Sequence, residues 1–363
     1  MTENDIKGIL SLINEPFTGK DFTSLGFVKQ ISYNGKKLTT ELEISDKDFP
    51  GAEELKTQIK SAIQKAFPDL SEIEINFKTG VLNHNSRQKE FVMPGVKNTI
   101  AVASGKGGVG KSTVAVNLTM ALAKLGLKVG LIDADIYGPS IPLMMGVHTS
   151  PGIAEDKGRK VLVPVEQYGI KLMSIGFLMK KGDAVVWRGP MASSALKQFM
   201  GDTMWGNLDV LLFDMPPGTG DIQLTLSQTI PLTGAVIVTT PQEIALADAK
   251  KGYVMFDKVN VPTLGIIENM SYYKSETGKI DYIFGEGGGR RMCAEIGVEL
   301  LGEIPINSKI REQGDAGNPI VNSNPDESES LIFRDIAKNL IISINKRNSS
   351  GEQSKGPEII IEG

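Results

Sequence analysis

A short run of residues in the first third of the chain has the types and spacing of a phosphate-binding loop. Residues 105–113 read GKGGVGKST, which matches the pattern G-x-x-x-x-G-K-[ST] without a mismatch. Glycines let consecutive backbone N–H groups curl around an anion, and the start of a following helix adds positive potential. We expect Lys111 to reach the β and γ phosphates of ATP and Ser112 to coordinate Mg²⁺. The candidate nucleotide contacts in the loop are Gly105, Lys106, Gly107, Gly108, Val109, Gly110, Lys111, Ser112 and Thr113.

Three aspartates stand where they could organise a magnesium ion and water. Asp133 ends the apolar run KVGLID and Asp135 follows it, while Asp214 ends the run DVLLFD and opens the segment DMPPGTGD. Carboxylates at strand ends beside a phosphate loop suit this chemistry. The alternative is that these residues cap helices or form turns, which are common roles for Asp after a strand.

The surrounding sequence predicts the sheet that positions these residues. From Asn98 onward, short apolar runs such as TIAVAS, KVGLID, DVLLFD, GAVIVTT, TLGIIE and LLGEI alternate with helical patterns. Continuous apolar strands alternating with helices are typical of a buried, mainly parallel sheet between two helical layers. In such α/β folds ligands bind at the carboxyl ends of the strands. The phosphate loop and the aspartates all follow strands in this way.

The chain divides by composition into four parts. Residues 1–80 carry two strand patterns joined by Asn34-Gly35, a hairpin signal, together with helical patterns and a third strand, and predict a small α/β domain. Residues 81–97 are polar and irregular and are interpreted as a linker. Residues 98–345 form the P-loop ATPase domain, and residues 346–363 are expected to be a flexible tail.

Charge and cysteine content exclude several classes of protein. The 363 residues carry a formal net charge of −4, which gives no overall basic field for nucleic acid or an anionic membrane. The single cysteine, Cys293, cannot form an intramolecular disulfide. The N-terminus lacks the basic start and apolar stretch of a signal peptide, and no run approaches the about 18 apolar residues of a membrane span. We therefore expect a cytoplasmic protein that does not enter a membrane, and the overall charge does not favour nucleic acid as a partner.

The loop resembles that of the deviant Walker A ATPases, which include MinD, ParA, ArsA and the nitrogenase iron protein, because Lys106 stands at its start. The resemblance implies a homodimer in which Lys106 crosses to the partner's nucleotide, as a finger residue does. It also implies that Asp133 and Asp214 hold waters on Mg²⁺ and that Asp135 orients the attacking water. Asn269 and Pro305 would border the adenine.

Longer motifs resemble the Mrp/ApbC-type iron–sulfur cluster carriers over residues 98–323. They are DADIYGPS from Asp133, WRGPM from Trp187, DMPPGTGD from Asp214, IENMS from Ile267 and IFG from Ile283. The resemblance implies a [4Fe–4S] cluster bound between two subunits and passed to apoproteins, with iron–sulfur assembly proteins as further partners. The C-x-x-C pair of these carriers follows the IENMS segment, but residues 272–278 here read YYKSETG.

Two functions therefore remain open, and a third is disfavoured. The first is an Mrp-type protein for binding and transfer of iron–sulfur clusters, in which Cys293 would supply only one thiolate per subunit. The second is a cluster-free ATP-dependent switch of the same family that regulates a protein or DNA partner. A metabolic kinase is disfavoured because the sequence shows no separate acceptor site. In both open cases we expect slow, Mg²⁺-dependent ATP hydrolysis in a homodimer.

Overall fold

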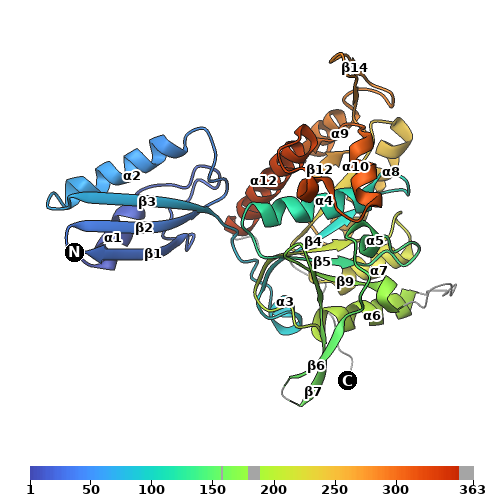
Figure 1. The fold of residues 1–363 in the computed structure, drawn as a ribbon, viewed down its shortest axis with the longest axis horizontal. Coiled ribbons are helices and arrows are strands. Elements are labelled where there is room, and N and C mark those ends of the chain that lie inside the picture. The colour runs from blue at the N-terminus through green and yellow to red at the C-terminus, as the bar shows by residue number, and fades with distance from the viewer. Residues whose placement is uncertain (157, 179–188, 351–363) are drawn as a thin grey trace. The chain divides into compact units, whose positions relative to one another are not determined.

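The computed structural model describes residues 1–156, 158–178 and 189–350 (Figure 1). These residues form two compact units. The first contains residues 1–83 and 341–350, and the second contains residues 84–340. Trp187 and Arg188, which belong to one of the family motifs, lie outside the described residues.

The first unit is a small α/β domain. Its sheet has the order β1-β2-β3, with β1 and β2 antiparallel and β2 and β3 parallel. The expected hairpin turn joins β1 to β2, where Asn34 pairs with Lys37 and Gly35 has a φ of +63°. The elements are α1 (Glu3–Leu10), β1 (Val28–Asn34), β2 (Lys37–Ile44), α2 (Ala52–Ala66) and β3 (Glu72–Thr79). Alternate residues of β2 are buried, among them Leu38 and Leu42, so one face of the sheet meets the apolar core.

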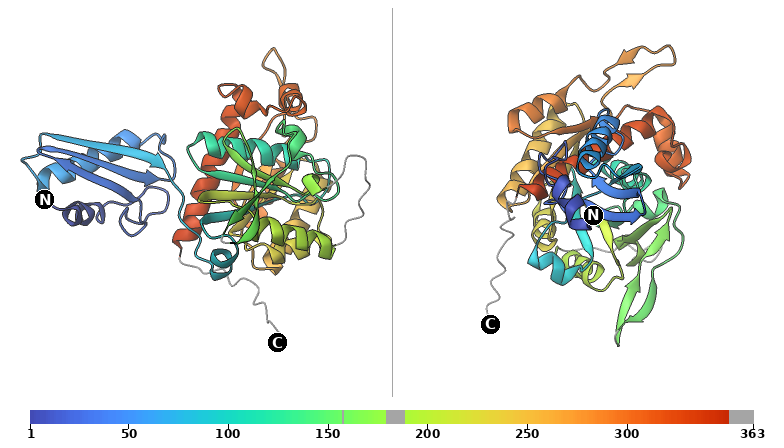
Figure 2. Two further views of the ribbon diagram at one scale, coloured as in Figure 1. Left: turned by 60° about the horizontal axis from the view of Figure 1, so that its bottom comes forward. Right: turned by 90° about the vertical axis from the view of Figure 1, so that its left-hand side faces the viewer.

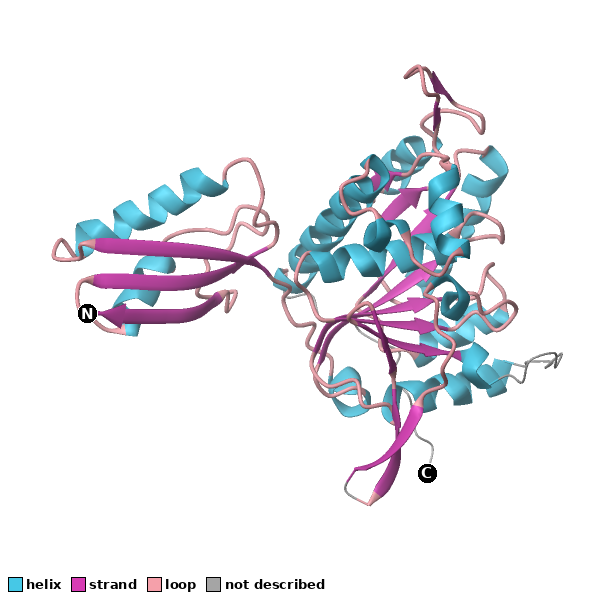
Figure 3. Cartoon of the chain, in the orientation of Figure 1, coloured by secondary structure: helices cyan, strands magenta, loops and turns pink. Residues whose placement is uncertain are grey.

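The second unit is built on one large sheet, whose strands fan out among the helices in Figure 3. Its strand order is β15-β12-β11-β4-β10-β5-β9-β8, and every neighbouring pair is parallel except β8 with β9. The strands are β4 (Val96–Ala103), β5 (Val129–Asp133), β8 (Val165–Gln167), β9 (Ile170–Ser174), β10 (Leu208–Asp214), β11 (Gly234–Thr239), β12 (Thr263–Glu268) and β15 (Leu300–Glu303). All residues of β5 and β11 are buried, as expected for strands covered on both faces.

Helices cover both faces of this sheet (Figure 2). On one face, α4 packs on the central strands together with α5, α10 and α11, and the first part of α12 packs near β15. On the other face, α6, α7, α8 and α9 bury a large apolar cluster with the strands. The helices are α3 (Arg87–Val92), α4 (Lys111–Lys124), α5 (Ile141–Met144), α6 (Gly189–Gly201), α7 (Asp221–Thr229), α8 (Glu243–Lys258), α9 (Gly288–Ile296), α10 (Ser308–Asp315), α11 (Ile320–Ser323) and α12 (Ser328–Ser349). The predicted three-layer P-loop fold is confirmed.

Two small hairpins leave the main sheet. One consists of β6 (Gly152–Asp156) and β7 (Arg159–Val163), and the other of β13 (Tyr273–Lys274) and β14 (Ile280–Asp281). A short 3-10 helix, Ile175–Leu178, follows β9. None of the helices in the described part of the chain combines the length and apolar character that a membrane crossing requires.

The structure differs from the expected linker. Residues 81–97 contain the helix α3 and the first residues of β4 rather than irregular chain. The buried side chain of Lys89 explains the order, because its ammonium group donates hydrogen bonds to the backbone oxygens of His84 and Lys97. A single long side chain thus ties both ends of this segment together.

The structure also differs at the far end of the chain. Residues 346–349, expected to begin a flexible tail, are the last turn of α12. The end of this helix belongs to the first unit, where the fully buried Asn345 accepts a hydrogen bond from the backbone of Leu82. Its amide nitrogen donates to the hydroxyl of Ser45 at 3.0 Å and to the carbonyl of Gly80 at 2.9 Å. These buried polar contacts hold the last turns of the helix, and sequence composition does not reveal them.

Candidate nucleotide-binding site

The glycine-rich loop connects β4 to α4 and is shaped by close backbone approaches. Gly110 has a φ of +79° and precedes the first residue of α4, and a Cβ there would lie 2.3 Å from the amide nitrogen of Asn269. A Cβ on Gly105 would lie 2.1 Å from the carbonyl oxygen of Asp248. Larger residues are therefore excluded at both positions, and the loop leads into the N-terminus of α4, where free backbone N–H groups suit an anion.

Two residues at the start of α4 share one buried carboxylate. Lys111 Nζ lies 2.6 Å from Oδ1 of Asp214, and Ser112 Oγ donates to Oδ2 of Asp214 at 2.6 Å. The side chain of Asp214 has no exposed surface. Burial raises the pKa of Asp214, while the charge of Lys111 and its hydrogen bond act in the opposite direction. The loop, the helix and β10 thus meet at one charged cluster.

The parallel register of β10 and β5 brings a second carboxylate, that of Asp133, next to Asp214. Asp214 pairs with Val102 on one side and with Asp133 on the other, and Asp133 in turn pairs with Ser174 of β9. Ser174 Oγ donates to Asp133 Oδ2 at 2.9 Å, and the backbone N–H of Ile141 donates to the same oxygen at 3.3 Å. Burial raises the pKa of Asp133 to about 8, and the nearby carboxylate of Asp214 adds to the rise.

Asp135 lies on the other side of Lys111. Its Oδ2 is 3.5 Å from Lys111 Nζ, and its Oδ1 accepts a hydrogen bond from the backbone of Tyr137 at 3.2 Å. The backbone N–H of Asp135 donates to Asp133 Oδ1 at 3.3 Å. The chain after β5 therefore directs the carboxylate of Asp135 toward Lys111 of the loop, while the carboxylate of Asp133 lies beneath it at the strand end.

The segment after β10 is attached to the start of the loop. The N–H of Met215 donates to the carbonyl of Val102 at 3.0 Å, and the N–H of Gly218 donates to the carbonyl of Ser104 at 2.9 Å. Ser104 Oγ in turn donates to the carbonyl of Lys106 at 2.9 Å. The segment after β10 is thus joined to the start of the loop by backbone hydrogen bonds at Met215 and Gly218.

The oxygens beside Lys111 suit a magnesium ion. The Ser112 hydroxyl and the Asp214 carboxylate are 2.6 Å apart, and Asp133 lies on the next strand. Mg²⁺ takes oxygen ligands and usually keeps several waters, with phosphate oxygens completing its shell. No group of three or more His, Cys, Asp or Glu side chains among the described residues is arranged to hold a metal by itself. The residues present therefore fit an ion held jointly by this chain, phosphates and water.

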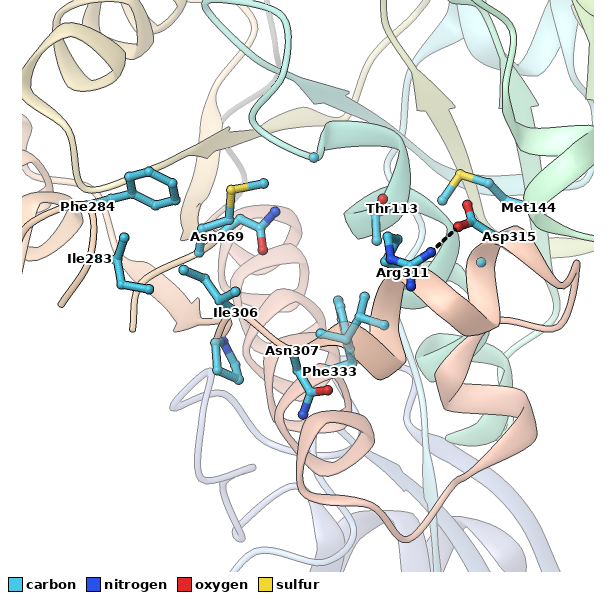
Figure 4. A pocket seen from close by; sticks show the side chains of 15 residues that line it. Thr113, Met144, Asn269, Ile283, Phe284, Ile306, Asn307, Arg311, Asp315 and Phe333 are labelled. Atoms are coloured by element: carbon cyan, nitrogen blue, oxygen red, sulfur yellow. Dashed lines mark hydrogen bonds and ion pairs between the residues drawn. The ribbon is translucent and has the colours of Figure 1, made fainter. Parts of the chain in front are cut away.

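A cavity of about 580 Å³ opens beside the loop and extends from Gly110 and Thr113 (Figure 4). Asn269 and Pro305, the two positions expected to border the adenine, both line it. Asn269 is 7% exposed, and its amide nitrogen donates to the carbonyl of Val109 at 2.8 Å. This bond fixes the orientation of the amide, so its oxygen remains as the acceptor that a ligand in the cavity can reach.

Lys106 is separate from this charged cluster. Its side chain is half-buried, and among the residues that the structure describes no carboxylate forms an ion pair with its ammonium group. Lys111, by comparison, has two carboxylate neighbours within the same chain. The two lysines of the loop therefore differ in their surroundings.

The thiol of this chain does not fit an iron–sulfur cluster. Cys293, the single cysteine, is 6% exposed on α9, and burial raises its pKa to about 11. Cluster ligands are thiolates, and a [4Fe–4S] cluster ordinarily takes four of them. Residues 272–278, for which the resemblance in sequence implied a cysteine pair, contain β13 and part of the turn toward β14. The thiol of Cys293 alone therefore cannot hold such a cluster.

Sequence reasoning missed several residues that the structure places at the site. Ser174 was not expected because β9 has no clear strand pattern in the sequence. Glu268 was read as part of a strand end, although its buried carboxylate accepts hydrogen bonds from Ser271 and Gly289. Ile283 and Phe284 line the cavity, although the sequence motif that contains them predicts no role for either residue.

Comparisons with known proteins find relatives of similar sequence and fold. A family model described as ParA, a NUBPL iron-transfer P-loop NTPase, matches residues 95–341. An iron–sulfur cluster carrier protein of Haemophilus influenzae is 46% identical over 338 residues, which cover 93% of this chain and 90% of the relative. The iron–sulfur protein required for NADH dehydrogenase of Arabidopsis thaliana mitochondria is 50% identical over 267 residues, or 73% of this chain and 84% of that protein.

One solved structure is similar in both sequence and fold. It is a nucleotide-binding protein from Archaeoglobus fulgidus in complex with ADP and with cobalt. It has a TM-score of 0.59 and 37% identity, and the match covers 69% of this chain and 96% of that one. The part of this chain that aligns is thus of the size of a complete nucleotide-binding protein.

Proposed function

Because the chain belongs to the ParA family, among the NUBPL-type iron-transfer P-loop NTPases, we propose that it is an ATP-driven dimeric switch in iron–sulfur cluster delivery. In this proposal it binds ATP with Mg²⁺ and hydrolyses it slowly. The observation that carries the proposal is the cluster in which Asp214 contacts both Lys111 and Ser112 at 2.6 Å. That arrangement joins the phosphate loop to the magnesium side of a nucleotide site.

Each residue of the cluster has a distinct task in this proposal. The backbone N–H groups of residues 105–112 bind the phosphates, and Lys111 moves between Asp214 and the γ-phosphate oxygens. Ser112 contributes a direct oxygen ligand, while Asp133 and Asp214 orient water around the ion. The ion itself supplies charge neutralisation on the β and γ phosphates. Asp135, 3.5 Å from Lys111, orients the attacking water.

The cavity favours adenine over guanine. The hydrogen bond to Val109 fixes the orientation of the Asn269 amide, so that its oxygen can accept a hydrogen bond from the exocyclic amine of adenine. Guanine would present a carbonyl oxygen at the same place, and two acceptors would then face each other. Pro305 gives the base an apolar contact on the same wall.

A homodimer follows from the first lysine of the loop. Lys106 lacks an ion pair among the described residues, so its charge is available for the nucleotide of a second subunit. A lysine supplied in this way stabilises the negative charge that develops on the transferred phosphoryl group. The segment at residues 214–221, hydrogen-bonded to Ser104, would then change with the state of the nucleotide.

The cargo of this switch is an iron–sulfur cluster for apoprotein clients, as the names of its relatives suggest. Because this chain offers one buried thiol, the cluster is a substrate whose ligands come mainly from donors or clients. The same observation favours a second candidate, a cluster-free ATP-dependent regulator of a protein partner. We place either activity in the cytoplasm, where an unpaired thiol stays reduced.

Anaerobic reconstitution with iron and sulfide tests the proposal. Wild type and Cys293→Ala are incubated with apoprotein acceptor, and iron content, visible spectrum, acceptor activation and ATP turnover are followed. ATP-dependent activation of the acceptor supports delivery, whichever protein holds the cluster. ATP turnover without any effect on the acceptor favours the cluster-free regulator. An absence of ATP binding contradicts both functions.

A further inference from the structure

The chain between Met270 and Gly288 leaves the sheet and returns to the point where it left. It exits after β12, forms the hairpin β13–β14, and comes back to start α9. The fully buried Glu268 marks that point, because one oxygen accepts a hydrogen bond from Ser271 Oγ at 2.6 Å and the other accepts the N–H of Gly289. One carboxylate therefore holds both ends of the excursion.

The close contacts at the return point leave no room for a side chain. A Cβ on Gly289 would lie 3.0 Å from an oxygen of Glu268, and a Cβ on Gly288 would lie 2.6 Å from the carbonyl of Pro241. The outgoing end is fixed as well, since the N–H of Ser271 donates to the carbonyl of Ile304 at 2.9 Å. The segment between Met270 and Gly288 is thus fixed to the domain core at both of its ends.

Both ends of the excursion form a wall of the nucleotide cavity. Met270 lines it from the outgoing end, and Ile283 and Phe284 line it from the returning end. In Figure 4, Phe284 and Ile283 lie beside Asn269, at the opposite end of the cavity from Arg311 and Asp315. Ile283 is 54% exposed and Phe284 is half-buried, so both have surface free to contact a ligand.

The apolar side chains of this wall determine which part of a nucleotide it can contact. The polar side chains elsewhere around the cavity are largely engaged, since Arg311 pairs with Asp315 at 2.7 Å and Asn307 bonds to the backbone of Lys309 and to Glu329. The wall formed by Met270, Ile283 and Phe284 offers apolar and aromatic surface. Such surface suits the flat face of a nucleobase and gives nothing to a phosphate.

We propose that residues 270–288 form a nucleobase flap, in which Phe284 contacts the base and Glu268 is the positioning residue that holds the flap in place. The inference rests on the proposed binding of ATP in this cavity. It adds a specificity-determining contact that comes from outside the phosphate loop and from the same excursion that carries the hairpin. Loss of Phe284, or release of the flap at Glu268, should weaken recognition of the base and leave phosphate binding intact.

The test compares two ligands that differ in whether they carry a base. Binding of ATP and of inorganic tripolyphosphate, each with Mg²⁺, is measured by calorimetry on wild type, Phe284→Ala, Phe284→Trp and Glu268→Gln. Base–aromatic contacts contribute enough binding free energy that Phe284→Ala should bind ATP about tenfold to a hundredfold more weakly than wild type. Its affinity for tripolyphosphate should not change, and Phe284→Trp should keep ATP affinity.

Glu268→Gln tests the positioning role. The amide retains the size of the side chain but places an NH₂ group against one of the two donors, so one end of the flap is released. It should show the same selective loss for ATP, to a smaller extent. Tyr282→Ala is the matched control, since Tyr282 is 40% exposed on the same excursion and does not line the cavity.

The outcomes separate this inference from the function on which it rests. An equal loss for both ligands in Phe284→Ala, or no loss for either, overturns the flap. A selective loss for ATP in Tyr282→Ala as large as that in Phe284→Ala also overturns it. Wild-type protein that binds neither ligand contradicts the proposed function itself, and melting curves identify any variant that has failed to fold.

Discussion

Lys111 Nζ lies 2.6 Å from Oδ1 of Asp214, and both side chains are buried at the carboxyl edge of the sheet. The second oxygen of Asp214 is engaged by Ser112, so neither oxygen of this carboxylate is unpaired. A buried ion pair of this kind contributes little net stability, because desolvation offsets much of the attraction. The role of this ion pair is functional, because it holds Lys111 beside the phosphate loop while Asp214 compensates the charge of the lysine.

Replacement of Lys111 should abolish ATP binding. Lys111→Ala removes the cation that contacts the β and γ phosphates, and truncating one partner of a buried charge pair typically costs enough to weaken binding at least about a hundredfold. Calorimetric titration with MgATP measures the loss. Lys124→Ala, in the exposed last turn of the same helix, is the control and should bind normally. Tight binding retained by Lys111→Ala would remove the loop from the nucleotide site.

Lys106→Ala should separate binding from dimerisation. Because Lys106 has no carboxylate partner in the described part of its own chain, its removal should leave MgATP affinity unchanged and prevent the ATP-dependent dimer. Sedimentation velocity with and without MgATP distinguishes the two states, and turnover should fall with the dimer. If the variant dimerises and turns over as wild type does, the lysine does not act across subunits.

Asp135→Ala should trap the ATP-bound state. The carboxylate lies 3.5 Å from Lys111 and is held by the backbone of Tyr137, a position from which it can orient water near the γ-phosphate. Loss of a positioned base or water-orienting group typically slows a reaction by about a hundredfold or more. Single-turnover measurements should show slow phosphate release from a long-lived ATP complex. Turnover at the wild-type rate would assign Asp135 to a purely structural role.

The nucleotide site could be predicted from the sequence because its parts follow local rules. The loop is one contiguous motif between a strand and a helix, and Asp133 and Asp214 each end an apolar run. Since carboxyl ends of parallel strands meet at one edge, these residues were expected to converge, and the register places them side by side.

The remaining parts depend on contacts between distant residues. Ser174 completes the environment of Asp133 only because β9 pairs with β5, and the sequence around β9 has no strong strand pattern. Glu268 reaches Gly289 across the whole hairpin excursion. Asn345 becomes buried through bonds to Ser45 and Gly80, so a segment resembling a tail is helical instead. None of these partners can be read from spacing within one element.

The thiol of Cys293 should be unreactive in the folded protein. Burial raises its pKa to about 11, so very little thiolate exists at pH 8, and the thiolate is the nucleophile. A disulfide reagent at pH 8 should modify native protein slowly and modify protein unfolded in guanidinium at once, with one equivalent of thiol. Fast labelling of the native chain would show an accessible thiolate and restore Cys293 as a candidate cluster ligand.

Asp133 should make the stability of the nucleotide-free protein depend on pH. Its pKa in the folded chain is raised to about 8, above the ordinary value of 3.8, so the folded state holds a proton that the unfolded state has released between these values. A raised carboxyl pKa gives stability that is fully present below pH about 4 and is lost as pH rises toward 8. Urea unfolding across this range should therefore show a decline to which Asp133 contributes roughly one proton, in addition to any share from Asp214, whose pKa burial also raises.

Two comparisons assign that decline to the buried carboxylate. Asp133→Asn cannot ionise and should remove most of the dependence, whereas Asp202→Asn, an exposed aspartate, should leave it unchanged. MgATP should also flatten the curve, because a cation near Asp133 and Asp214 favours their charged forms and opposes the effect of burial. A pH dependence identical in wild type and Asp133→Asn would mean that this carboxylate is ionised in the folded chain without cost. The buried cluster at Lys111 would then carry the negative charge of Asp133 in addition to that of Asp214.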